Sequence, residues 1–196
     1  MSQSINLYNQ LANHKLFNKS INFGLKRIKL ALSLLGHPEK KLKNVISVVG
    51  ESGKFTTLSS LKSFIEANNQ KVTAHISPSI QDIKERFYMS KKYLTHNEIK
   101  KTIKKIEKLN IPLTVFECLT LVYIINASKI NADYNIQETG ALWRLDSNNI
   151  NDFPIIQVCT NINKQHLNFL KKKTLDEVCL LYTSDAADEI TGVVRG

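Results

Sequence analysis

The sequence predicts an α/β domain of the P-loop type, with a three-layer α/β/α arrangement and a mainly parallel sheet. The first observation is an apolar segment at 44–49 that runs into a turn containing glycine, lysine and threonine. The second is an amphipathic segment at about 55–68, and the third is an apolar segment at 71–76 that precedes a proline loop at 77–79. A strand, a helix and a strand in this order form a right-handed β-α-β unit whose parallel strand ends carry the binding loops.

The turn after the first strand has the composition of a phosphate-binding loop. Gly50, Gly53, Lys54 and Thr56 fit the short pattern G-x-x-G-K-x-[ST], but the commoner pattern G-x-x-x-x-G-K-[ST] fails because Phe55 stands where it requires a hydroxyl. Glycines let backbone N–H groups close around phosphate oxygens, the next helix presents its positive end, the lysine adds a charge and the hydroxyl reaches a metal ion. The short pattern also describes ordinary tight turns, so other motifs must decide whether ATP binds here.

Periodicity predicts further helices and strands along the chain. A helix is expected to end before Gly36 and Pro38, which both stop helices. Thr95 and Glu98 have the spacing of a capping box, which predicts a helix running to about Leu109. The expected elements are helices at 20–35, 95–109 and 113–128 and strands at 133–138 and 154–160.

Several side chains on these helices have expected environments. Glu117 falls in an apolar helix and therefore needs a partner for its charge. The lysines of the 95–109 helix are expected to face water. The same is expected of three basic residues of the first helix, Lys26, Arg27 and Lys29. The helix at 55–68 is expected to bury Leu58, Leu61, Phe64 and Ile65 on one side.

Composition limits the classes of function. The chain has 27 Lys and Arg residues against 17 Asp and Glu, a net charge of +10, but no aromatic-interleaved basic patch accompanies the charge. Its three cysteines are far apart and form no C-x-x-C pair, so neither a disulfide framework nor a zinc site is indicated. The N-terminus lacks a signal segment, and the apolar runs are too short to span a bilayer. We expect a cytoplasmic monomer without nucleic-acid or membrane partners.

From about residue 20 to 178, separated motifs follow the order and spacing of one family. The chain resembles the N-terminal part of folylpolyglutamate synthase/dihydrofolate synthase, within the Mur ligase superfamily. The segments at 24–28 and 35–38 are similar to the family's opening helix and turn, and 50–57 is similar to its G-T-N-G-K-G-S-T loop. Further similar segments are 76–80 (T-S-P-H-L), 85–87 (E-R-I/F), 114–120 (T-x-F-E-x-L-T), 138–149 (E-V-G-x-G-G-R-L-D-A-T-N), 160–166 (T-N-I-x-x-D-H) and 174–177 (T-L-E-E).

The resemblance implies an ATP-dependent ligase with a Mur ligase central-type domain. Such enzymes phosphorylate a carboxylate of dihydropteroate or folate, and the amine of L-glutamate then attacks the acyl phosphate. The resemblance assigns ATP binding to Gly50, Ser52, Gly53, Lys54, Thr56 and Thr57. It assigns Mg²⁺ to Thr56, Glu138 and His166, catalysis to Lys54, Glu138 and His166, and substrate contact to Ser77, Pro78 and Arg86. Hard oxygen ligands suit magnesium, and positive charge stabilises a phosphoryl group in transfer.

The sequence also departs from the family pattern. Phe55 replaces a loop glycine, and Glu51 places negative charge at an anion site. Ala141, Leu142 and Trp143 fill a glycine-rich segment, and two family residues are replaced, by Ser79 and Gln165. A degenerate nucleotide-binding module without catalysis is therefore one alternative. A peptidoglycan-precursor Mur ligase is another, although the segments at 24–28 and 144–146 favour the folate branch.

Three parts of the chain are expected to differ in origin and role. Residues 1–43 form a helical lead-in, and 44–178 form an ATP-binding domain that is incomplete at its C-terminal edge. Residues 179–196 are expected to be a non-native tail, because the segment at 180–189 resembles a recurrent translated read-through of sequencing adapter. The composition agrees, since 180–196 contain no Lys and no Asn in a chain rich in both. A genuine short disordered tail is the alternative. We therefore expect a truncated ligase that does not turn over by itself.

Overall fold

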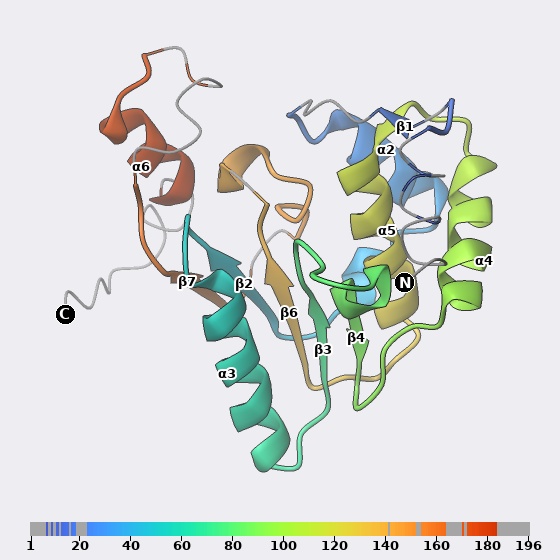
Figure 1. Cartoon of the computed structure of the whole chain (residues 1–196), viewed down its shortest axis with the longest axis horizontal. Helices are drawn as coiled ribbons and strands as arrows, with labels where there is room; N and C mark the ends of the chain where they lie inside the picture. The colour runs from blue at the N-terminus through green and yellow to red at the C-terminus, as the bar shows by residue number, and fades with distance from the viewer. Residues whose placement is uncertain are drawn as a thin grey trace.

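In the computed structural model the described residues are 7, 9, 11, 13–15, 17, 18, 23–140, 142–151, 154–163, 170 and 172–183. Their main feature is a five-stranded sheet with the strand order β4-β3-β6-β2-β7 (Figure 1). β4 is antiparallel to β3, and the other neighbouring strands are parallel. The strands are β2 (Val45–Val49), β3 (Val72–His75), β4 (Phe87–Met89), β6 (Tyr134–Glu138) and β7 (Ile156–Cys159). The predicted α/β class with a mainly parallel sheet is confirmed.

The predicted β-α-β unit consists of β2, α3 (Lys54–Ala67) and β3, but its two strands are not neighbours. β6 lies between them, with Ile136 opposite both Ile46 and Ala74. Asn135 of β6 donates from Nδ2 to the Lys43 carbonyl at 2.6 Å and accepts the Thr73 hydroxyl at 2.6 Å. The carboxyl end of β6 therefore lies between the loops that follow β2 and β3.

Helices cover both faces of the sheet, which gives the predicted three layers (Figure 1). On one face, Leu58, Leu61 and Ile65 of α3 pack on apolar residues of β2, β3 and β6. The expectation that Phe64 is buried beside them is wrong, because 67% of this residue is exposed. Phe64 is one position before Ile65, and one residue turns a helix by about 100°, so Phe64 points away from the sheet.

The other face is covered by α5 (Val115–Ala127), with α4 (His96–Glu107) and α2 (Lys26–Leu34) outside it. Every residue of α5 except Phe116 is buried. The predicted capping box of α4 is confirmed, since Thr95 Oγ1 accepts the Glu98 N–H at 3.2 Å and Glu98 Oε2 accepts the Thr95 N–H at 2.7 Å. The lysines at 100, 101, 104, 105 and 108 are exposed, as predicted.

The N-terminal segment shares its core with the rest of the domain. α2 begins at Lys26, later than predicted, and ends before Gly36, whose φ is +76°. Residues Leu7, Leu11 and Phe17 belong to the same buried cluster as α2, α4 and α5. The short strand β1 (Phe17–Asn18) pairs in parallel with β5 (Leu113–Thr114). The segment predicted as a lead-in therefore packs directly on the helices that cover the sheet.

The structure corrects the prediction that Arg27 lies on a solvated face. Its guanidinium contacts the Glu117 carboxylate, with Nη2 3.1 Å from Oε1 and Nε 3.2 Å from Oε2. The Glu117 side chain is only 4% exposed, and the prediction that it needs a partner is confirmed. Helical periodicity could not reveal this contact, because the two residues are 90 positions apart.

The remaining elements are short. Three 3₁₀ turns, η1 (Pro38–Lys41), η2 (Ile83–Arg86) and η3 (Trp143–Leu145), lie in segments predicted as loops or left unassigned. β7 is an edge strand, and half of Ile155 and Ile156 is exposed. α6 (Leu175–Thr183) crosses the predicted boundary between 178 and 179, and Val178 is buried with Val49 and Trp143. Residues 184–196 lie outside the described residues, so the origin of the tail stays a prediction.

Within the described ranges, no helix combines the length and the apolar character needed to cross a bilayer.

Candidate functional site

The candidate site lies at the edge of the sheet where the parallel strands end. Val48 of β2 is opposite Glu138 at the end of β6, and Val49 is opposite Cys159 at the end of β7. The loops that follow β2 and β7, together with Glu138, are therefore neighbours. This is the edge at which parallel sheets place their ligands.

The loop after β2 depends on its two glycines. Gly50 has φ +121° and Gly53 has φ +81°, in the region that side chains other than glycine rarely adopt. A Cβ at Gly50 would lie 2.7 Å from the Asn161 carbonyl oxygen and would also overlap the Thr160 hydroxyl. The first glycine of the motif is thus required both by its φ and by the close approach of the loop after β7.

Asn161 holds the phosphate loop in place. Its Oδ1 accepts the backbone N–H groups of Ser52 at 2.8 Å and Glu51 at 3.2 Å, and its carbonyl also accepts the Glu51 N–H at 3.1 Å. The sequence analysis gave Asn161 no role, although it stands in the segment similar to T-N-I-x-x-D-H. That motif was the only available signal, because the contact joins residues 109 and 110 positions apart.

Lys54 is the first residue of α3, and its side chain extends back towards the loop that precedes the helix. Its Nζ donates to the carbonyl of Gly50 at 2.7 Å and to that of Glu51 at 3.2 Å. Ser52 and Thr56 are exposed, and Thr57 is half-buried in the first turn of the helix. The six predicted ATP-binding residues therefore form one continuous loop and helix start.

The departure at Phe55 does not distort the loop. Phe55 lies in the first turn of α3 with a negative φ, so this backbone does not require the glycine that the family has there. The Phe55 residue is 49% exposed, which places an apolar ring on the surface of the first turn.

Glu138 is buried at the centre of the edge, where its residue is 3% exposed. Its Oε2 accepts the backbone N–H of Ser77 at 3.0 Å. Burial raises the pKa of Glu138, and the Ser77 N–H and the positive charges of Lys54 and Arg86 oppose that rise. Its carboxylate oxygens are hard donors of the kind that Mg²⁺ prefers, so Glu138 stays a candidate metal ligand.

Ser77 and Arg86 belong to the same cluster. The Arg86 Nη1 donates to Ser77 Oγ at 3.1 Å, and Arg86 is only 7% exposed. Pro78, the third predicted substrate contact, is exposed beside them. The structure thus brings together four side chains chosen from separate motifs, namely Lys54, Ser77, Arg86 and Glu138.

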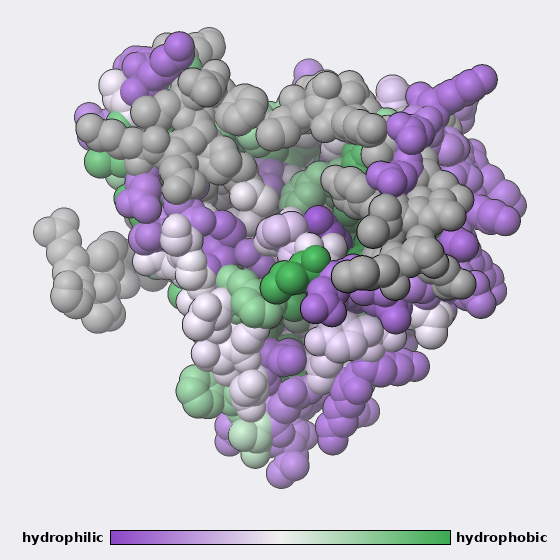
Figure 2. Space-filling model, in the orientation of Figure 1, coloured by the Kyte–Doolittle hydropathy of each residue, from purple (hydrophilic) through white to green (hydrophobic). Residues whose placement is uncertain are grey.

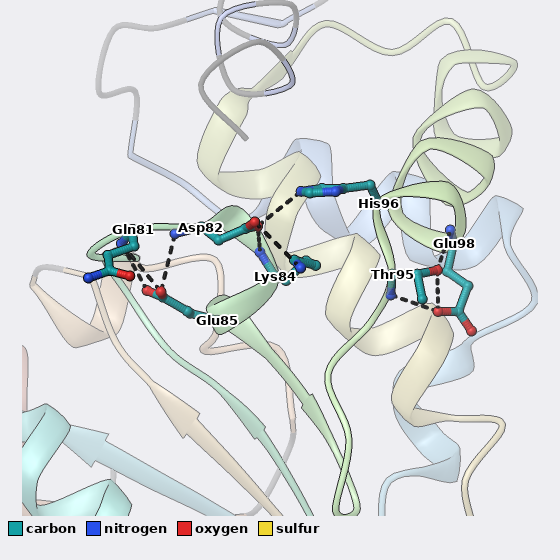
Figure 3. Close-up of polar contacts among 7 residues, drawn as sticks. All are labelled: Gln81, Asp82, Lys84, Glu85, Thr95, His96 and Glu98. Atoms are coloured by element: carbon teal, nitrogen blue, oxygen red, sulfur yellow. Dashed lines mark hydrogen bonds and ion pairs between the residues drawn. The ribbon is translucent and has the colours of Figure 1, made fainter. Parts of the chain in front are cut away.

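The carboxylates of Asp82 and Glu85 fix the segment just before Arg86, and Figure 3 shows contacts of both. Glu85 accepts the backbone N–H groups of Ile80, Gln81 and Asp82 at 2.7–3.3 Å. Asp82 Oδ1 accepts the Lys84 N–H at 2.9 Å and lies 3.0 Å from His96 Nε2 of α4. Partial burial opposes ionisation of Asp82, but the Lys84 N–H and His96 outweigh it and lower its pKa. The loop after β3 is thereby tied to α4.

The segment after Glu138 is also fixed by side chains. Asp146 accepts the N–H groups of Gly140 at 3.0 Å and Asn148 at 2.9 Å, and Asn148 donates to the Glu138 carbonyl at 2.9 Å. Leu142 and Trp143, which replace family glycines, are buried. They therefore add apolar packing beside the site. Ala141 lies outside the described residues.

His166, predicted as a catalytic residue and metal ligand, lies outside the described residues, as does Gln165. Within the described ranges no group of three His, Cys, Asp or Glu side chains could hold a metal ion. The oxygen donors that are present, the Glu138 carboxylate and the Thr56 hydroxyl, suit magnesium, and the buried Glu138 faces Lys54 at the phosphate loop. The donor chemistry therefore fits Mg²⁺ bound together with phosphate oxygens.

Comparisons with known proteins agree with these motifs. No family model matches the chain. The dihydrofolate synthase/folylpolyglutamate synthase of Bacillus subtilis is 29% identical over 181 residues, which cover 88% of this chain and 40% of that protein. The solved structure of Escherichia coli FolC in complex with DHPP and ADP covers 90% of this chain and 42% of its own, with a TM-score of 0.81 and 30% identity.

A third comparison concerns the nucleotide and metal. The bifunctional folylpolyglutamate synthase/dihydrofolate synthase of Yersinia pestis, solved with AMPPNP and Mn, has a TM-score of 0.80 and 26% identity and covers 93% of this chain. The chain spans about two fifths of the length of the proteins it matches, namely 40%, 42% and 44% of these three. Given these similarities and the shared motifs, the chain belongs to the dihydrofolate synthase/folylpolyglutamate synthase family.

Proposed function

We propose that this chain is the nucleotide-binding part of an ATP-dependent ligase that joins L-glutamate to dihydropteroate or to a folate. The observation that carries the proposal is the meeting of Lys54, Glu138, Ser77 and Arg86 at one end of the sheet. Four residues from four separate motifs converge there. They lie next to a loop whose glycines, lacking side chains, allow a phosphate to approach the backbone. The relatives that share the motifs are named for both folate reactions.

In the proposed reaction the substrate carboxylate attacks the terminal phosphorus of ATP, and ADP leaves. The amine of glutamate then attacks the acyl carbon, loses a proton and expels phosphate, so that an amide bond forms. Lys54 would turn from the Gly50 and Glu51 carbonyls towards the phosphate oxygens and neutralise their charge. Ser77 would orient Glu138 through its N–H group, and Arg86 would fix Ser77, so Arg86 acts by positioning.

Magnesium would be held by Glu138 and Thr56, with His166 as a further predicted ligand. When bound, the ion supplies positive charge to the phosphate oxygens. The contribution of this chain is to orient Glu138 and to oppose the rise in its pKa that burial causes. Lys54, Arg86 and the Ser77 N–H all act in that direction.

The match to the Bacillus subtilis relative covers 40% of that protein, so we propose that this chain binds nucleotide but does not complete the ligation by itself. Protein in solution is expected to be monomeric and cytoplasmic, and neither nucleic acid nor membrane is expected as a partner.

The test is nucleotide binding by this chain, measured by titration with a fluorescent ATP analogue in the presence of magnesium. Lys54→Ala should weaken binding by about tenfold or more, because a charge-assisted contact to phosphate contributes on the order of 1.5–3 kcal/mol. Lys71→Ala, an exposed lysine at the opposite end of β3, is the matched control and should bind like the wild type. Equal affinity of wild type and Lys54→Ala would contradict the proposal.

A nucleotide module without catalysis is the second candidate. It is supported by the replacement of family residues by Glu51, Phe55 and Trp143, of which Glu51 adds negative charge to a loop expected to bind an anion. The two candidates are distinguished by assaying ADP formation and ATP binding in a protein extended to the length of the relatives. Formation of ADP that depends on both pterin substrate and glutamate supports the ligase, whereas binding of ATP without any such turnover supports the module.

A further inference from the structure

A groove lined by six lysines lies between α4 and the C-terminal end of α5. Its volume is about 700 Å³, a size that suits a small-molecule ligand. Met89 lines it and is opposite Thr73 near the start of β3, so the groove lies at the sheet edge opposite the candidate site. The lysines that line it are Lys92, Lys101, Lys104, Lys105, Lys108 and Lys129.

The positive charge in this groove is not balanced by its other lining residues. Glu98 is the one acidic residue among them; its charge acts on Lys92 and Lys129, but it is one negative charge against six lysines. Burial and then the charges of Lys105 and Lys101 lower the pKa of Lys129, so these ammonium groups repel one another. Figure 2 shows hydrophilic side chains gathered over α4, at the right of the view.

A buried polar bridge fixes the two helices under the groove. Lys129 Nζ donates to Asn126 Oδ1 at 2.9 Å, and Asn126 Nδ2 donates to the Thr102 hydroxyl of α4 at 3.0 Å. Asn126 is 8% exposed and Thr102 is 5% exposed. Lys101 and Lys105 of α4 and Lys108, which follows its last residue in a helical conformation, are spaced by four and three, so they share one face. The hydrogen bonds between Thr102, Asn126 and Lys129 therefore connect the two helices whose lysines line the groove.

We propose that this groove binds a small anion built of linked phosphate groups, at a site separate from the phosphate loop. Lysines are compact charges on flexible stems, which can adapt to a chain of phosphates, and the lining contains no arginine fork for planar carboxylates. The lining also contains no aromatic residue on which a nucleic-acid base could stack. A short phosphate chain satisfies the unbalanced charge better than either alternative.

The experiment is a calorimetric titration of the 196-residue chain with inorganic tripolyphosphate. The groove variant is Lys101→Gln with Lys105→Gln, and the control is Lys26→Gln with Lys100→Gln. All four lysines are exposed and lie on helices, so both variants lower the net charge by two, but the control lysines do not line the groove. The groove variant should bind about tenfold more weakly or worse, while the control should change by less than about twofold.

The titration is repeated in a Lys54→Ala background, which separates the groove from the phosphate loop. Groove binding should persist there and should weaken as salt is raised from about 50 mM to about 300 mM. The same protein is also titrated with ATP. Binding of ATP through the groove lysines supports the proposal, and its affinity relative to that of tripolyphosphate shows whether the nucleoside contributes. Three results would overturn it: equal losses in both double variants, loss of all binding with Lys54→Ala, or tighter binding of a single-stranded oligonucleotide through these lysines.

Discussion

The backbone N–H of Ser77 donates to the Glu138 carboxylate at 3.0 Å, although 61 positions separate these residues along the chain. The contact joins the loop after β3 to the end of the central strand β6. Arg86 fixes Ser77 from the other side, through a bond of 3.1 Å to its hydroxyl. The orientation of the proposed metal ligand therefore depends on two loops that the sheet brings together.

The contact between Asn161 and the phosphate loop should contribute to stability. Asn161→Ala removes the acceptor of two backbone N–H groups, and we expect the free energy of unfolding to fall by about 1–2 kcal/mol. Urea unfolding followed by circular dichroism measures this change. Asn131→Ala is the control, since Asn131 is exposed and its Oδ1 accepts from the ammonium of Lys43, and it should change stability by less than about 0.5 kcal/mol. Equal effects of the two substitutions would show that Asn161 does not hold the loop.

His75 should make stability depend on pH. Burial, and then the charge of Arg86, lower its pKa from 6.5 to about 3, against a hydrogen bond with Asn148. Between these values the unfolded chain binds a proton that the folded chain does not, so stability falls as pH falls below 6.5 and is unaffected above it. The loss at roughly pH 5 should be about 2 kcal/mol.

His75→Phe tests that assignment. Phenylalanine can retain ring contacts with Phe87 and Tyr123, which stack on His75, but it cannot titrate. Urea unfolding at roughly pH 5 and pH 7.5 should show a smaller pH effect in the variant than in the wild type, by about 2 kcal/mol. The same pH effect in both proteins would mean that His75 is not the titrating group.

The ion pair between Arg27 and Glu117 should behave as a coupled unit. Arg27→Met leaves the nearly buried Glu117 without its partner, and we expect a loss of about 2–4 kcal/mol. Adding Glu117→Gln to that variant should restore part of the loss, because Gln carries no charge yet can still accept the Thr114 N–H. A double-mutant cycle from urea unfolding measures the coupling. Strictly additive effects would indicate that the pair is open in solution.

Local signals predicted the parts of the fold that depend on neighbouring residues. Thr95 and Glu98 are three positions apart, and their capping box formed as the pattern indicated. Gly50 and Gly53 marked the loop because a positive φ is a property of single residues. The family motifs then selected Ser77, Arg86 and Glu138, which local periodicity alone could not have connected.

Long-range relations were beyond the sequence patterns. The insertion of β6 between β2 and β3 follows from strand pairing, which periodicity does not encode. Arg27 was assigned to solvent because a helical pattern describes only its own helix, and Asn161 received no role because its partners lie in another loop. The short strand β4 was missed, since three residues are too few to show an alternating pattern.

The central claim is that Lys54 and Glu138 belong to one nucleotide and metal site. Its most direct test is the affinity of this chain for AMPPNP, measured with magnesium and with EDTA, in the wild type and in Glu138→Gln. Magnesium should strengthen binding to the wild type by about tenfold or more, and Glu138→Gln should lose this gain but keep the metal-free affinity. An undiminished effect of magnesium in Glu138→Gln would contradict the claim.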